Sequence, residues 1–187
     1  MSSKAAVGAI ELSSIGIGFR VQDALLKAAS VDLLIARTIC AGKYLIVFAG
    51  TVSDVEAAMQ TAQSEGKDAV IDSLVVPNIH PAVFPAMTQS VVLSPEEVGA
   101  LGIVETFSAV SAMVAADVAA KAANVTLFRL NLAMAMGGKG FLAMTGSVAN
   151  VEAAVQAAAD AVVQDHGLLV STTVIPRPSR ELYTEYI

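Results

Sequence analysis

Two kinds of apolar spacing alternate along the chain and predict its secondary structure. Residues 18–30 carry apolar side chains close to helical spacing, and a second helix is expected to open at Ser53, with Glu56 placed as in a capping box. Compact apolar runs bounded by turn residues are typical of strands. Four such runs occur in the first half of the chain, at residues 6–12, 31–39, 43–50 and 68–76. The predicted order is therefore β-α-β-β-α-β.

The second half of the chain repeats the first. VGAIELSS at residues 7–14 matches LGIVETFS at 101–108 with an offset of 94, whereas the turn glycine Gly42 matches Gly138 with an offset of 96. The second copy therefore carries two extra residues just before its Gly-Lys turn. We predict two homologous domains, each an α+β unit with a ferredoxin-like sheet and two helices on one face. Their predicted bounds are residues 1–88 and 99–187, with a linker at 89–98.

The composition changes this picture because charges are scarce. Hydrophobic residues make up 55% of the chain and charged residues 15%, against about 25% charged in a typical soluble domain. No apolar stretch reaches the ~20 residues of a membrane-spanning helix, so we expect much of the surface to be buried against other subunits. The net charge of -6, without a basic cluster, argues against nucleic acid. The first residues lack a signal-peptide pattern, which favours a cytoplasmic location.

Several of these repeated motifs resemble a known family. GIVET at residues 102–106, the matched DALLKAASV and DVAAKAANV at 23–31 and 117–125, and VIPRP at 174–178 resemble the bacterial microcompartment shell proteins of the tandem-domain class. The turn TICAGK at residues 38–43 is similar to the TICPGK turn of iron–sulfur-binding tandem shell proteins from propanediol-utilisation compartments. The resemblance implies a homotrimer that imitates a hexamer, tiles with other shell proteins through its lateral edges, and belongs to a compartment shell. Two units in one chain agree with this, since three chains close a six-unit ring.

Cys40 is the only cysteine of the chain and lies in that turn. By itself it suits either an inert buried thiol or a functional thiol in a loop. The resemblance implies a [4Fe-4S] cluster, one per trimer, ligated by Cys40 from three chains on the threefold axis, with the fourth iron left to water, a small molecule or nothing. Ala41 stands where the similar motif has Pro, which is expected to loosen the turn, and Met134 lies near the matching position of the second repeat.

Glycines surround the two central turns. The segments at Ala41-Gly42 and Met136-Gly137-Gly138 lack the spacing of a phosphate-binding loop. They suit ordinary hairpin glycines, and they also suit the rim of a narrow pore, with backbone groups lining the opening. A pore for metabolites without a cluster is therefore an alternative function on the same fold.

Four residues are candidates for contacts at the shell edge. Lys27 and Lys121 match between the repeats, while Arg177 in VIPRP matches Asn78. By themselves the lysines suit solvated helix positions. The resemblance implies that they pack against counterparts on a neighbouring disc and that Arg177 docks into that disc with its planar guanidinium.

Histidines and carboxylates form no catalytic pattern in the sequence. His80 and His166 lie at unmatched positions without zinc-ligand spacing, and Glu11 and Glu105 fall in separate repeats. Because no nucleophile–base grouping is present, we do not expect an enzyme. The leading hypothesis is a structural shell trimer whose cluster transfers electrons across the shell, with an enclosed redox enzyme as a further partner. A small-molecule-binding signalling trimer is the alternative from another class.

Overall fold

The computed structural model describes residues 6–94, 96–165 and 167–184. The chain forms two compact units. Of the described residues, the first unit contains those up to Ile79 together with Ala133–Gly138, and the second contains those in 80–132 and from Lys139 onward. A short segment of the second repeat thus packs with the first unit.

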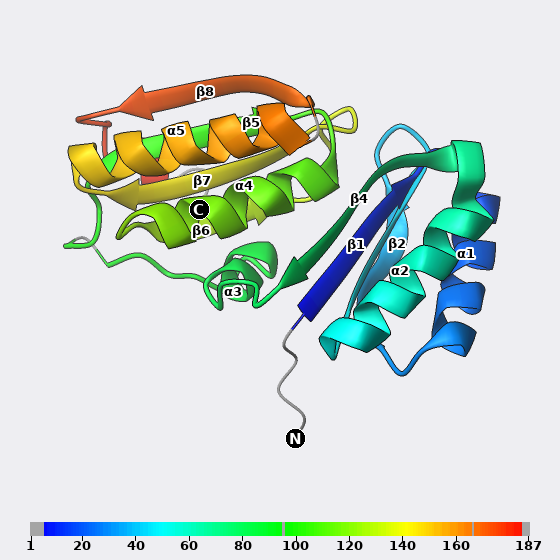
Figure 1. Cartoon of the computed structure of the whole chain (residues 1–187). Coiled ribbons are helices and arrows are strands. Elements are labelled where there is room, and N and C mark those ends of the chain that lie inside the picture. Colours follow the sequence, from blue (N-terminus) through cyan, green and yellow to red (C-terminus); the bar gives the residue numbers. More distant parts are fainter. Residues whose placement is uncertain (1–5, 95, 166, 185–187) are drawn as a thin grey trace. The chain divides into compact units, whose positions relative to one another are not determined.

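In the first unit a four-stranded sheet carries two helices on one face (Figure 1). Its elements are β1 (Ala6–Leu12), α1 (Ile15–Ala28), β2 (Asp32–Ile39), β3 (Lys43–Gly50), α2 (Val52–Gly66), η1 (Lys67–Ala69) and β4 (Val70–Pro77). The strand order is β2-β3-β1-β4, and each neighbouring pair is antiparallel.

The second unit repeats this architecture. Its elements are α3 (Val83–Met87), β5 (Ala100–Thr106), α4 (Ala109–Ala122), β6 (Thr126–Asn131), β7 (Gly140–Gly146), α5 (Val148–Asp165), β8 (Leu169–Ile175) and α6 (Glu181–Thr184). The strand order β6-β7-β5-β8 is the same as in the first unit. The predicted tandem α+β fold is therefore confirmed. No helix in the described ranges is both long and apolar enough to cross a bilayer.

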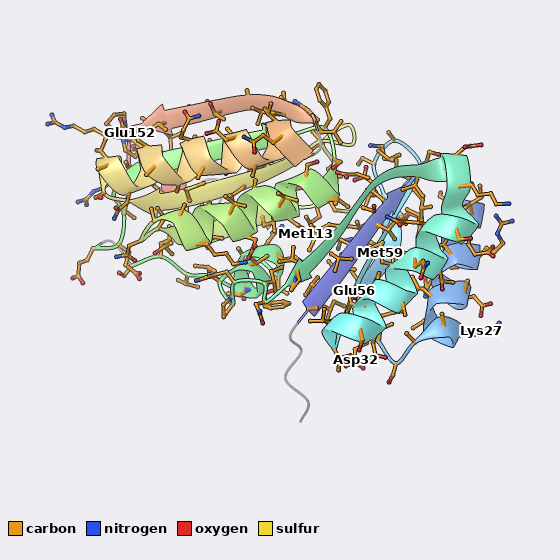
Figure 2. All side chains as sticks on the ribbon, in the orientation of Figure 1. Lys27, Asp32, Glu56, Met59, Met113 and Glu152 are labelled. Carbon is orange, nitrogen blue, oxygen red and sulfur yellow. The ribbon has the colours of Figure 1, made fainter. Side chains whose placement is uncertain are left out.

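The core of the first unit lies between its sheet and its helices. Tyr44, Ile46 and Phe48 of β3 point into this layer, where they meet Val21 and Leu25 of α1 and the inner face of α2. In Figure 2, Met59 marks that inner face of α2, and Lys27 lies at the end of α1, away from the sheet.

Two matched glycines make close packing in these layers possible. A Cβ on Gly8 would lie 2.5 Å from the Phe48 ring, and a Cβ on Gly102 would lie 2.7 Å from Val151 of α5. Each glycine therefore leaves room for a side chain that packs over an inner strand of its sheet.

The helix starts correct the sequence prediction. Helix α1 begins at Ile15 rather than at residue 18, because the Ser14 side chain accepts a hydrogen bond from the Ile17 N–H and caps the first turn. Helix α2 is capped by Thr51, which exchanges hydrogen bonds with Asp54, so the predicted Ser53–Glu56 box was wrong. Strand β3 ends at Gly50, and the next residue, Thr51, caps α2.

The connection between β4 and β5 is structured. It contains the short helix α3, and the apolar residues Val91, Leu93 and Val98 pack against a cluster of Leu101, Phe128, Ala143 and Tyr183. The Tyr183 phenol contacts Thr145 at 3.3 Å and the Gly99 carbonyl at 3.3 Å. The connection and the short helix α6 thus cover part of the second sheet.

Candidate metal centre

Cys40 lies in the three-residue turn between β2 and β3, directly after the buried Ile39. Ala41 and Gly42 both have positive φ, 65° and 70°, so the turn uses two left-handed residues in succession. Glycine adopts this conformation freely, whereas alanine does so at a cost of about 1–2 kcal/mol. A proline at position 41 has φ fixed near -65° and would require a different backbone in this turn.

The loop Ala133–Gly138, here called the 133–138 loop, contacts Cys40 at two points. The Cys40 N–H donates to the Ala133 carbonyl at 3.0 Å, and the Ala135 N–H donates to the Cys40 Sγ at 2.9 Å. Both alanines have φ of 59°. Half-buried Cys40 is therefore held at two points, its backbone N–H and its side-chain sulfur.

A buried ion pair lies beside this turn. The Lys43 Nζ is 2.7 Å from the Glu11 Oε1, and the side chains are 17% and 0% exposed. A Cβ on Gly138 would lie 3.4 Å from the Lys43 Nζ and 3.6 Å from the Cys40 carbonyl oxygen. The ion pair, the Cys40 turn and the 133–138 loop therefore form one local cluster in the first unit.

The second unit contains the matching ion pair, which is more exposed to solvent. The Lys139 Nζ is 2.5 Å from the Glu105 Oε1, with side chains 40% and 23% exposed. The Ser171 hydroxyl donates to the other carboxylate oxygen. The hydrogen bond from Lys139 holds the pKa of Glu105 below its ordinary value, against the opposing effect of burial.

The predicted site residues divide into two groups. Cys40, Ala41, Gly42 and Gly138 come together in the cluster described above, and Met136 and exposed Gly137 lie in the same 133–138 loop. The predicted edge residues lie at other places in the fold. Lys27 and Lys121 occupy the last turns of α1 and α4, Asn78 follows β4 with φ of 58°, and exposed Arg177 follows β8.

Both edge lysines pair with an aspartate one turn earlier, and the two pairs differ in burial. Lys27 meets exposed Asp23, whereas Lys121 meets Asp117, whose side chain is 8% exposed. Asp117 also accepts a hydrogen bond from the His80 backbone N–H at 2.7 Å. The start of the connection between β4 and β5 is therefore hydrogen-bonded to α4. The His80 ring nitrogen Nδ1 also accepts a hydrogen bond from the Ala82 N–H. His166 lies outside the described residues.

Sequence reasoning missed Ala133 and Ala135 as contacts of Cys40. The two-residue difference between the repeats was a signal for an altered loop, but alanine carries no chemical mark of a donor. Among the described residues, no three His, Cys, Asp or Glu side chains gather as metal ligands. Since the chain has a single cysteine, a multi-thiolate site must draw its cysteines from several copies.

Comparison with known proteins decides the family. The BMC domain matches residues 6–79 and again residues 100–178, one match in each repeat. The chain belongs to the BMC-domain family. This family consists of structural shell proteins without enzymatic activity, and its members oligomerise and tile with other shell proteins, which explains the scarcity of charge.

Similar proteins match most of the length of this BMC-domain chain. The bacterial microcompartment shell protein PduT of Citrobacter freundii is 43% identical over 97% of both chains. The crystal structure of a microcompartment protein from Desulfitobacterium hafniense DCB has a TM-score of 0.83 at 40% identity, covering 96% of this chain and 98% of that one. The fused permuted hexameric shell protein MSM0275 from the RMM microcompartment has a TM-score of 0.62 at 26% identity, with coverage of 84% and 81%.

These similarities identify the BMC-domain chain as a component of a bacterial microcompartment shell. The resemblance drawn from the repeated motifs is thereby confirmed. Membership of a shell family favours this function over the signalling trimer.

Proposed function

We propose that the protein is a trimeric shell component that holds a [4Fe-4S] cluster on its threefold axis, ligated by Cys40 from three copies. The observation that carries this proposal is the placement of Cys40. Cys40 is half-buried in a tight turn, and its sulfur accepts a hydrogen bond from a backbone N–H. Thiolates that accept backbone hydrogen bonds are the usual ligands of iron–sulfur clusters.

The chain's donor set fits three of the four iron positions. Each copy contributes one thiol, so a closed trimer contributes three, and the fourth iron is left to water or a small molecule. When bound, such a cluster supplies one-electron transfer. The protein's part is to bring three turns to the axis and to orient each sulfur.

Residues next to Cys40 suit a narrow opening on that axis. We place Ala41, Gly42, Met136, Gly137 and Gly138 at its rim. Ala41, Gly42, Gly137 and Gly138 have positive φ, so the backbone turns tightly. Ala41, Gly42 and Gly137 are also exposed and add little side-chain bulk. The Lys43–Glu11 pair lies beside the turn as a nearly buried brace, which keeps the lysine charge compensated near the cluster.

Lateral edges complete the proposal. Lys27, Lys121, Asn78 and Arg177 are placed at the contacts with adjoining discs. Lys27 pairs with Asp23, but its side chain is 73% accessible, and Arg177 is exposed, so a neighbouring molecule can contact both.

The decisive experiment is anaerobic reconstitution of three proteins with iron and sulfide. Wild type and Ala41→Gly both keep the thiol and are expected to bind four irons per trimer and to give an EPR signal after reduction. Cys40→Ser is expected to remain a trimer but to lose most of the iron and the signal. Equal iron in the Cys40→Ser variant and in wild type would rule out ligation by Cys40.

The same samples test the alternative function. A wild-type trimer that stays colourless and free of iron after anaerobic reconstitution would favour a metabolite pore, in which Cys40 only lines the opening.

A further inference from the structure

We propose that the 133–138 loop is a positioning element for the Cys40 sulfur, and that the Ala135 N–H raises the reduction potential of the cluster that Cys40 would ligate. This inference rests on the proposed function and adds a regulating contact to it. The contact comes from the second repeat, which has no thiol of its own, so the two halves of the chain take different roles at one site.

The unequal length of the two matched loops is the first argument. Residues 40–42 connect β2 to β3, whereas residues 132–139 connect β6 to β7. The longer loop reaches the Cys40 turn, and six of its residues, Ala133–Gly138, pack with the first unit rather than with their own. The extra length of the second repeat therefore supplies contacts that a loop as short as the first would lack.

The second argument is the geometry of the two hydrogen bonds. Cys40 donates its N–H to Ala133, and Ala135 donates its N–H to the Cys40 sulfur. To do this, Ala133 and Ala135 both adopt the left-handed conformation, which alanine disfavours. Such residues persist only where the surroundings over-determine them. The pair of contacts fixes both the turn backbone and the direction of the sulfur.

The third argument is the effect of an N–H on a ligating sulfur. A hydrogen bond withdraws electron density from the thiolate, which stabilises the reduced cluster and makes its potential less negative. A backbone donor is suited to this task because it does not titrate. With one Ala135 for each Cys40, a trimer would apply the effect equally to all three ligands.

A pair of substitutions at one position tests this. Ala135→Pro removes the N–H, whereas the control Ala135→Gly keeps the N–H and suits φ of 59°. Because proline would also displace the loop, a third protein carries an ester in place of the Ala135 amide, introduced by semisynthesis, which removes the hydrogen and keeps the side chain.

The first readout is the reduction potential of the reconstituted trimer, followed by EPR during a redox titration. We expect a more negative potential in the proline and ester proteins and the parent value in Ala135→Gly. An unchanged potential in the ester protein would overturn the inference and leave the cluster itself intact.

The second readout needs no cluster. Iodoacetamide alkylation of the iron-free trimer is measured at a pH at which the thiol is ionised in every protein. Loss of the hydrogen bond leaves the sulfur more nucleophilic, so the proline and ester proteins should react faster than the parent, by roughly two- to tenfold, as for loss of one ordinary hydrogen bond. If the parent binds no iron, the proposed function fails, while this comparison still decides the role of the loop. Equal rates in all proteins would overturn it.

Discussion

The same lysine–glutamate pair stands beside both central turns, but its surroundings differ. Glu11 is fully buried and Lys43 is 17% exposed, whereas Glu105 and Lys139 are 23% and 40% exposed. A buried carboxylate depends strongly on its partner, because water cannot replace it. A partly hydrated carboxylate depends less, since solvent screens the loss.

Lys43→Met therefore should destabilise the protein far more than Lys139→Met. We expect a loss on the order of 3 kcal/mol for Lys43→Met, because the Glu11 charge stays buried without its ammonium partner. Lys139→Met, the matched control, should cost about 1 kcal/mol or less. Urea unfolding of both variants measures the difference. Equal losses would contradict the unequal burial of the two pairs.

Glu105 predicts a pH dependence of stability with a defined sign. Its pKa is lowered in the folded state, first by the hydrogen bond from Lys139. A lowered folded pKa adds stability that is present above the ordinary glutamate pKa of about 4.3 and is lost as the pH falls through the folded value.

Glu105→Gln should remove that component. Unfolding free energies of wild type and Glu105→Gln are compared from about pH 6 down to about pH 3. The wild type is expected to lose more stability on acidification than the variant. Parallel pH profiles would show that the Lys139 contact does not stabilise the ionised carboxylate.

Among the elements, α1 places one buried glycine, Gly18, against its sheet. A Cβ on Gly18 would lie 2.5 Å from the Tyr44 ring, which is buried and makes a hydrogen bond to Gln22 of the same helix at 2.8 Å. Gly16 lies on the same helix and is exposed, with no atom within 4 Å of an added Cβ. The two glycines thus have opposite roles in one element.

Gly18→Ala should destabilise the protein by about 1–3 kcal/mol, the usual cost of overpacking. Gly16→Ala should be neutral or stabilising by up to about 1 kcal/mol, because alanine is the better helix former. Denaturant midpoints of the two variants decide this. A Gly18→Ala variant as stable as wild type would mean that α1 can move away from Tyr44 at little cost.

For the whole molecule, the shortage of charge and the two-unit chain both point to assembly. Two homologous units per chain need three chains to close a ring of six. We expect light scattering to give a particle of about three times the 19.1 kDa chain mass. The predicted edge residues should affect only the association of trimers into sheets.

Arg177→Glu should therefore leave the trimer intact and weaken its sheets. The charge reversal removes a planar donor and introduces repulsion at the lateral contact. Light scattering of dilute protein tests the trimer, and electron microscopy of concentrated protein tests the sheets. Lys67→Glu, the same change of charge at an exposed residue of η1, serves as the charge-matched control. A loss of the trimer in Arg177→Glu would move this residue from the disc edge to the interface within the disc.

Much of the fold could be predicted because both halves of the chain carry the same sequence pattern. Matched motifs in the two halves confirmed each other, and short apolar runs of the right spacing marked all the principal strands. The errors lie where a single residue outweighs a pattern. Ser14 starts α1 earlier than its apolar spacing indicated, and Thr51 caps α2 in place of Ser53, since the strand end determines where the first free N–H groups lie.

The sequence alone determined the repeat, the family resemblance and the single thiol in its turn, because these depend on residue identity and spacing along the chain. Only the tertiary structure decided what surrounds that thiol. The 133–138 loop lies nearly a hundred residues away, and its contacts with Cys40 come from the backbone of two alanines. Backbone donors have no residue signature, so their role becomes visible only when folding brings distant segments together.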